Sequence, residues 1–129
     1  MKYTHKVGTA AGTFPPFLVG GKEVILTSVT MMSISPGDLL VLRLDVGWKK
    51  PTHGDAGEIE LKIRKDSPDG PVIYRILETC VEKAYTMERV TDIGNVPVQH
   101  YYLTACSADS RAVITGPYSL QGSVFPKNE

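Results

Sequence analysis

The chain has 129 residues, and its 14 Lys and Arg residues balance its 14 Asp and Glu residues. A chain of this length suits one domain that buries about two thirds of its unfolded surface, so it needs no metal or disulfide framework to fold. The formal net charge of zero gives no field to attract a polyanion, which disfavours nucleic acid and anionic membranes as partners.

The ends and the cysteines indicate a protein made in a reducing compartment. No apolar run approaches the roughly 18 residues that span a membrane, and no apolar stretch of a secretion signal follows residues 1–6. We therefore expect synthesis in the cytoplasm without a signal peptide. Cys80 and Cys106 are too few for a disulfide framework, so we expect two free thiols. A bridge formed later, between subunits, is the alternative.

Residues 1–23 are rich in Gly and Pro, which predicts an irregular N-terminal arm rather than a central strand. The arm nevertheless carries an apolar cluster that needs cover, and a β-sandwich has open sheet edges that need cover too. We expect the arm to lie along a sheet edge, preferably that of a neighbouring subunit. The predicted assembly residues are Phe14, Pro15, Pro16, Phe17, Leu18 and Val19.

The next segments alternate with a period of two, as strands do. Residues 24–34 read as a strand with a bulge near Ser28, and residues 35–38 as a turn. Residues 40–48 are the clearest core strand, and residues 58–64 alternate strictly, as a half-buried antiparallel strand does. The predicted core residues are Leu42, Leu44, Val46, Trp48, Ile59, Leu61, Ile63, Leu103 and Leu120.

The second half reads as shorter strands. A hairpin at residues 66–70 leads into a strand at 71–77, and apolar residues at helical spacing between 77 and 87 suggest a helical turn or two. Further strands are expected near residues 86–90, 99–106, 111–115 and 118–124. The sequence thus predicts an all-β fold: a single antiparallel β-sandwich, jelly-roll or immunoglobulin-like, at residues 24–125, followed by a tail at 126–129.

No residue pattern points to catalysis, a cofactor or a metal. The three histidines, His5, His53 and His100, are far apart, and the pairs His53–Asp55 and Asp66–Asp69 read as solvated loops. His100 and Cys106 share a strand but are about 20 Å apart, too far for an activated nucleophile. Glu58 and Glu60 alternate with core residues and read as a solvated sheet face. We therefore expect no enzyme.

Two resemblances concern the second half of the chain. The stretch from Asp92 to Ala105, with Tyr101 and Tyr102, resembles the tyrosine corner of fibronectin type III and immunoglobulin-like domains, where a Tyr bonds back to the preceding loop. That resemblance implies a structural role for the tyrosine.

A longer resemblance is to bacterial spore-surface proteins of the exosporium-protein-C-like kind. The elements that carry it are residues 61–66, 70–74, 91–92, 102–104 and 115–118. The resemblance implies a structural surface protein and brings no catalytic residues with it.

We therefore expect a non-enzymatic structural protein, without cofactor or metal, that forms a homo-oligomer or docks on a larger shell. Its final location would be a spore surface or, as an alternative, a virion, where it would be a capsid decoration, tail or fibre domain of a phage or virus. A lectin-like binding module is a further alternative.

Overall fold

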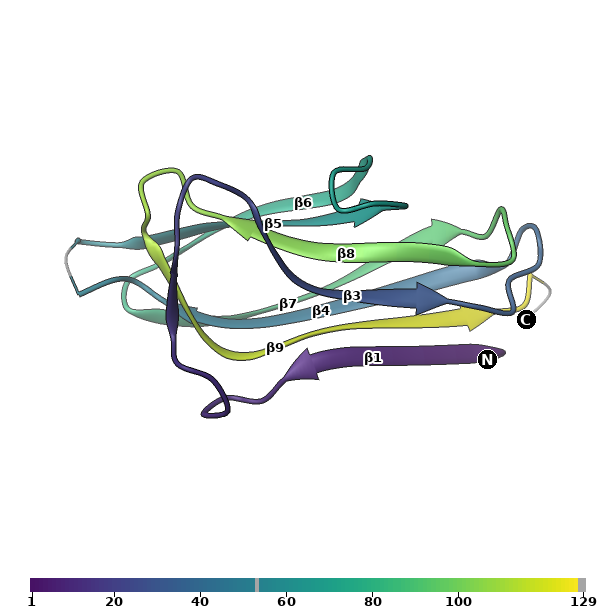
Figure 1. Ribbon diagram of the computed structural model, residues 1–129, viewed down its shortest axis with the longest axis horizontal. Coiled ribbons are helices and arrows are strands. Elements are labelled where there is room, and N and C mark those ends of the chain that lie inside the picture. The colour runs from purple at the N-terminus through teal and green to yellow at the C-terminus, as the bar shows by residue number, and fades with distance from the viewer. Residues whose placement is uncertain (53, 128–129) are drawn as a thin grey trace.

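A computed structural model describes residues 1–52 and 54–127, and these residues form two packed β-sheets (Figure 1). The described residues contain no helix, and hence none that is long and apolar enough to cross a membrane. The strands are β1 (Tyr3–Thr9), β2 (Phe17–Val19), β3 (Val24–Met31), β4 (Leu39–Lys49), β5 (Gly57–Lys65), β6 (Val72–Cys80), β7 (Lys83–Ile93), β8 (Gln99–Cys106) and β9 (Ala112–Phe125).

The strand order is that of a jelly roll. Sheet A has the order β1-β9-β4-β7, with β2 also paired to β9, and sheet B has the order β3-β8-β5-β6. Leaving β2 aside, the first strand pairs with the last, β3 with β8, β4 with β7, and β5 with β6, so the chain is one long hairpin rolled into two sheets. The all-β sandwich is confirmed, and of the two topologies expected, the structure has the jelly roll.

The core lies between the sheets and follows the alternation of the strands. On β4, the inward side chains from Leu40 to Trp48 are at most 1% exposed. The Trp48 indole N–H donates to the Thr86 hydroxyl at 3.0 Å, which satisfies its one polar atom inside the core. All nine predicted core residues are buried.

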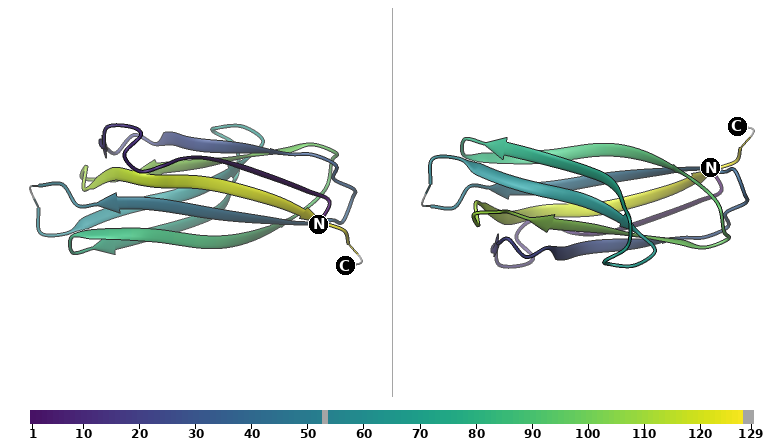
Figure 2. Two further views of the ribbon diagram at one scale, coloured as in Figure 1. Left: turned by 90° about the horizontal axis from the view of Figure 1, so that it is seen from below. Right: turned by 90° about the horizontal axis from the view of Figure 1, so that it is seen from above.

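The N-terminal segment is more regular than expected. β1 pairs with β9 over seven residues, from Tyr3 opposite Val124 to Thr9 opposite Tyr118, and β2 pairs with the other half of β9 (Figure 2). The stretch between the two strands, which holds Pro15 and Pro16, and residues 20–23 after β2 are irregular. The expectation of an irregular arm is corrected, because the strand-forming residues at 3–7 find an open partner in β9 of the same chain.

Two further expectations are corrected. The helical turns expected between residues 77 and 87 are absent, because β6 and β7 run through this segment and are joined at Val81 and Glu82. The gap between the strands expected at 111–115 and 118–124 is also absent, because β9 continues through Gly116 and Pro117 with a cis peptide bond between them. The bulge in β3 lies between Ile25 and Thr27, slightly before the expected position.

The two sides of the sandwich differ. On one side, β1 and β3 are linked by hydrogen bonds from Tyr3 Oη to the Thr30 carbonyl at 3.0 Å, from Thr27 Oγ1 to the Val7 carbonyl at 3.2 Å, and from the Thr30 N–H to His5 Nδ1 at 3.2 Å. These bonds close the side formed by β1 and β3. On the opposite side lie β6 and β7, each the last strand of its sheet.

Candidate interaction surfaces

The apolar residues of the arm divide into a buried and an exposed group. Val19 is 1% exposed and belongs to the core, and the Phe14 ring packs edge-on against Tyr118 with 5.4 Å between centroids. Phe17 and Leu18 remain 36% and 57% exposed. Pro15 and Pro16 are exposed as well. The exposed part of the predicted assembly segment is therefore Pro15 to Leu18.

Phe14 has a local role that the sequence did not indicate. Its ring covers Gly116, whose φ of 80° lies in the left-handed region. A Cβ at position 116 would lie 2.8 Å from the Phe14 ring. Gly116 thus allows the arm to lie flat on β9.

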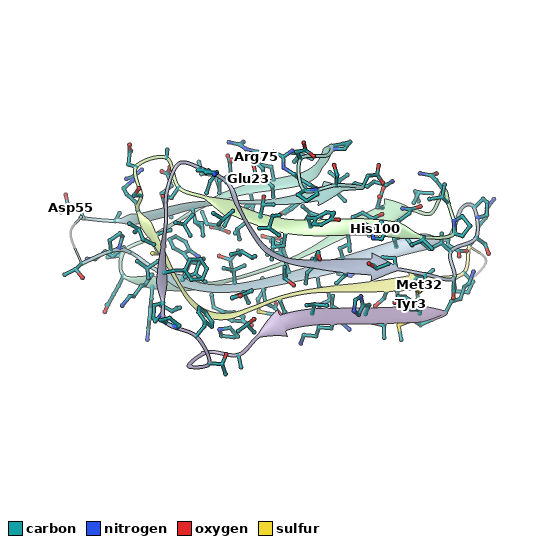
Figure 3. All side chains as sticks on the ribbon, in the orientation of Figure 1. Tyr3, Glu23, Met32, Asp55, Arg75 and His100 are labelled. Atoms are coloured by element: carbon teal, nitrogen blue, oxygen red, sulfur yellow. The ribbon has the colours of Figure 1, made fainter. Side chains whose placement is uncertain are left out.

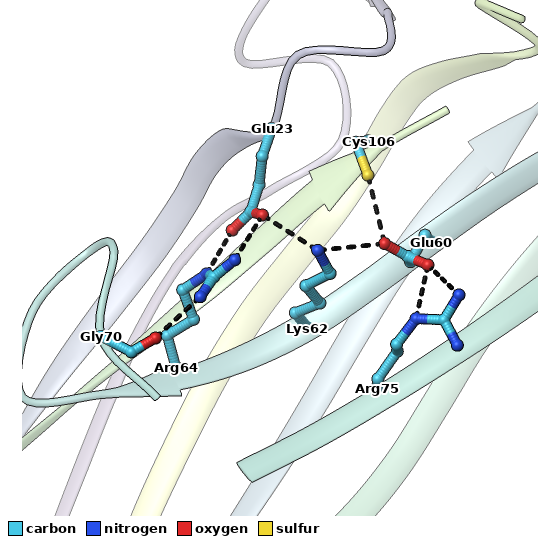
Figure 4. A network of polar contacts seen from close by, with 7 residues as sticks. All are labelled: Glu23, Glu60, Lys62, Arg64, Gly70, Arg75 and Cys106. Carbon is cyan, nitrogen blue, oxygen red and sulfur yellow. Dashed lines mark hydrogen bonds and ion pairs between the residues drawn. The ribbon is translucent and has the colours of Figure 1, made fainter. Parts of the chain in front are cut away.

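A network of charged side chains covers part of the outer face of sheet B (Figure 4; Glu23 and Arg75 are also labelled in Figure 3). Arg64 donates two hydrogen bonds to Glu23, from Nε at 2.6 Å and from Nη2 at 2.9 Å, and a third to the Gly70 carbonyl at 2.7 Å. Lys62 bridges the two carboxylates, at 3.2 Å from Glu23 and 3.1 Å from Glu60. Arg75 and the Cys106 thiol both donate to Glu60.

The network holds its carboxylates ionised. The hydrogen bonds from Arg64 lower the pKa of Glu23 from 4.5 to about 2. Burial alone would raise the pKa of Glu60, but Lys62 and Arg75 outweigh burial and lower it. Glu58 is likewise paired, with Arg111 at 2.9 Å. Glu58 and Glu60 therefore serve as ion-pair partners within the fold, and the lowered pKa of Glu60 is the opposite of what a general acid requires.

The two cysteines lie on opposite faces of sheet B. The Cys80 sulfur approaches the Trp48 ring and Gly57 inside the sandwich, whereas Cys106 bonds to Glu60 on the outer face. Burial raises the pKa of both thiols, which disfavours the reactive thiolate. An intrachain disulfide is excluded by this geometry, because the sheet separates the two sulfurs.

Two of the candidate metal residues come close to each other. The Thr30 N–H donates to His5 Nδ1 at 3.2 Å and the Thr30 hydroxyl bonds to His100 Nδ1 at 3.1 Å, whereas Asp55 lies far from His100 (Figure 3). Within residues 1–52 and 54–127, no group of three or more His, Cys, Asp or Glu side chains is placed to hold a metal. The predicted loop pair with Asp55 involves His53, which lies outside the described residues.

The buried tyrosine differs from the one in the domains it resembles. Tyr101 is fully buried and donates its hydroxyl hydrogen to the Asp92 carboxylate at 2.7 Å, while Gln99 Nε2 donates to the same hydroxyl at 2.7 Å. The Gln99 side chain also accepts the Asn95 N–H at 2.6 Å. The tyrosine thus bonds back to the end of β7 through a carboxylate rather than through loop backbone.

The free edge of β7 was missed by the sequence analysis. Its one strand neighbour among the described residues is β4, which pairs with it along all eleven residues without a bulge. Tyr85, Met87 and Ile93 project from its outer face and are about half exposed. The signal that was overlooked is the alternation of exposed and inward residues from 83 to 93, which the helical spacing of neighbouring apolar residues obscured.

Comparisons with known proteins show a similarity in fold only. No known family and no curated protein matches the sequence. A solved structure of the disulfide-linked pili that form Bacillus endospore appendages is similar, with a TM-score of 0.50 and 10% identity over 95% of this chain and 86% of that chain.

Two further solved structures are looser matches. The CBM36-1 domain of a multidomain xylanase from the hindgut metagenome of Trinervitermes trinervoides has a TM-score of 0.47 and 9% identity, over 94% of this chain and 97% of that chain. The enzymatically active domain of tailspike protein 4 of bacteriophage CBA120 has a TM-score of 0.37 and 13% identity, over 91% of this chain and 19% of that chain. The chain is a β-sandwich, similar in fold to the endospore appendage subunit.

Proposed function

We propose that this protein is a non-enzymatic structural subunit that associates with further copies of itself in a surface layer. The observation that carries the proposal is the free edge of β7. An uncovered edge presents unpaired N–H and C=O groups, and proteins that stay monomeric blunt such edges with charged side chains, proline, bulges or a covering segment. β7 has no proline, bulge or covering strand over its eleven residues, and its charges have both signs, so a second copy can pair with it without like charges opposite each other.

The remaining surface supports the same role. The charged groups of the network on sheet B are engaged with one another, and burial favours the protonated form of both thiols, so neither set offers an activated nucleophile or base. The zero net charge gives little repulsion between copies. The similarity to the Bacillus appendage structure supports the use of this fold as the subunit of a fibre.

A spore surface is the location we favour, because the sequence elements between residues 61 and 118 resemble spore-surface proteins. A virion shell is the alternative location, since the same edge would serve it equally. Antibody labelling of intact spores of the producing organism tests the location: surface labelling supports the spore assignment, and its absence contradicts it.

The self-association itself is tested on the purified full chain. Light scattering across a range of protein concentrations is expected to give a mass above the 14.1 kDa of one chain, rising with concentration. A mass of one chain at every concentration would contradict the proposal.

A further inference from the structure

We propose that two copies of this chain pair through β7, antiparallel and about a twofold axis at Met87, so that their A sheets become one continuous sheet. This inference rests on the proposed function and specifies its contact. A twofold contact uses the same strand from both copies, so one strand must be complementary to itself.

The side of the molecule that carries β7 is bridged less than the opposite side. Tyr74 of β6 forms a side-chain hydrogen bond with Glu88 of β7, whereas three hydrogen bonds link β1 and β3 on the opposite side. β6 is the other edge strand on this side, but its pairing with β5 is interrupted by a bulge at Ile73, between the pairs Ile63–Tyr74 and Arg64–Val72. β7 is longer and continuous, which makes it the better template for an added strand.

The charges of β7 select one register. With Met87 opposite Met87 of the second copy, the numbers of any two opposite residues add up to 174. Residues 83–91 of one strand then pair with residues 91–83 of the other, nine residues in each strand. No two like charges then lie directly opposite. Besides Met87 with Met87 of the second copy, the opposite pairs are Lys83 with Thr91, Ala84 with Val90, Tyr85 with Arg89 and Thr86 with Glu88.

The neighbouring registers each bring like charges together. Centring the pair on Glu88 or on Arg89 places that charge against its own copy, and centring it on Thr86 places Lys83 against Arg89. Like charges directly opposite destabilise a strand pair. A register centred on Tyr85 avoids this conflict but pairs only residues 83–87 of β7.

The favoured register also gives Arg89 a partner that it lacks within one chain. Arg89 lies directly opposite Arg43 of β4, and no carboxylate of the described residues forms an ion pair with either side chain. In the pair of copies, each Arg89 meets the ring of Tyr85 from the other copy, where a guanidinium and an aromatic face attract. Met87, 55% exposed in one chain, is covered at the centre.

Disulfide trapping tests the register. Opposite Cα atoms of an antiparallel pair are about 4.5–5.5 Å apart, within the range that a disulfide spans. In the Cys80→Ser, Cys106→Ser background, the Met87→Cys variant is expected to form a covalent dimer when oxidised glutathione is added. The two engineered thiols are oxidised to the disulfide and glutathione is reduced.

Two further variants in that background control for chance collisions. Position 85 is opposite position 89 of the second copy, and so lies about 13 Å from its own counterpart along the strands. Tyr85→Cys alone and Arg89→Cys alone should therefore stay monomeric on a non-reducing gel, whereas a mixture of the two should cross-link. Cross-linking of Tyr85→Cys alone, or none from Met87→Cys, would overturn the register.

A charge variant of the otherwise unaltered chain keeps the test independent of the cysteine background. Met87→Lys places two ammonium groups face to face and should raise the dimer dissociation constant about tenfold or more. Ile93→Lys, equally exposed on the same strand but outside the paired residues, should change it less than about threefold. Self-association that neither variant weakens would refute the β7 contact and leave the proposed function standing, whereas a monomeric unaltered chain would refute both.

Discussion

Leu44 occupies the middle of the core, fully buried on the central strand β4 between β7 and β9. Truncating it removes buried methyl groups and leaves a cavity that the flanking strands cannot fill. Leu44→Ala is therefore expected to lower the free energy of unfolding by about 2–5 kcal/mol, measured by denaturant titration. Lys49→Ala, at the exposed end of the same strand, should change it by less than about 0.5 kcal/mol. A change below about 1 kcal/mol for Leu44→Ala would contradict its placement in the core.

Glu23 should make stability depend on pH in the acid range. Its pKa is lowered from 4.5 to about 2 in the folded chain, chiefly by Arg64. A lowered folded-state pKa stabilises the protein above pH 4.5, and this contribution is lost as the pH falls toward 2. Glu23→Gln should cost on the order of 1–3 kcal/mol at pH 7 and progressively less below pH 4.5.

The measurement is a set of denaturant titrations between pH 7 and pH 2 on the unaltered chain and two variants. Asp109→Asn serves as the control, because the Asp109 side chain is 77% exposed and 3.9 Å from its nearest cation. The difference between Glu23→Gln and the unaltered chain should shrink as the pH falls, while the control stays parallel to the unaltered chain. A difference that is constant over this range would show that Arg64 does not hold Glu23 ionised.

Some features of single residues could be predicted from the sequence, and others could not. The core positions on β4 and β5 were predictable, because strict alternation assigns each side chain to one face. The Glu23–Arg64 pair was not, since its partners are 41 residues apart and meet only after β3, β8 and β5 are in register. Gly47 is similar: a Cβ there would lie 2.3 Å from the Gly116 carbonyl, a contact that only the pairing of β4 with β9 creates.

At the level of elements, strands with a strong contrast between their two faces were predictable, and the edge strands β1 and β7 were not predicted in full. β5 and β8 have neighbours on both sides and one face in the core, so their patterns are regular. β1, β6 and β7 are edge strands whose side chains are largely half-buried or exposed, so the contrast between their faces is weak. A weak contrast leaves helical and irregular interpretations open, and the errors at residues 1–23 and 77–87 fall in these strands.

Removing the N-terminal segment tests the predicted domain boundary. A chain that starts at residue 24 lacks the seven-residue ladder between β1 and β9, the bonds from β1 to β3 and the buried Val19. We expect a clearly lower melting temperature by circular dichroism and a tendency to aggregate, since β9 becomes a long exposed edge. An unchanged cooperative melting transition would instead establish residues 24–125 as an independent domain.

For the whole molecule, the cysteines are expected to be dispensable. Because the sulfurs lie on opposite faces of sheet B, the Cys80→Ser, Cys106→Ser variant should unfold within about 1 kcal/mol of the unaltered chain. Its mass by light scattering should also be unchanged. If the unaltered chain assembles only under oxidising conditions and the variant never does, a bridge between subunits is responsible.

A continuous layer needs more than one contact, because a twofold contact closes on itself. The exposed residues Phe17 and Leu18 lie on β2, which borders β9 at the edge of sheet A away from β7. We propose this segment as the second contact. Two different contacts at opposite edges of one sheet would let the subunits extend without closing.

The rolled hairpin has a consequence for how the chain acquires its structure. β9 is the last strand of the domain to be synthesised, yet it is the shared neighbour of β1, β2 and β4. During synthesis on the ribosome, sheet A therefore cannot be completed until residues 112–125 have emerged. Until then the apolar side chains of β4 remain uncovered. Pairings between such distant segments are slow to form, on the millisecond-to-second scale. The nascent protein thus passes through an interval in which uncovered apolar side chains and unpaired strand edges make it prone to aggregation.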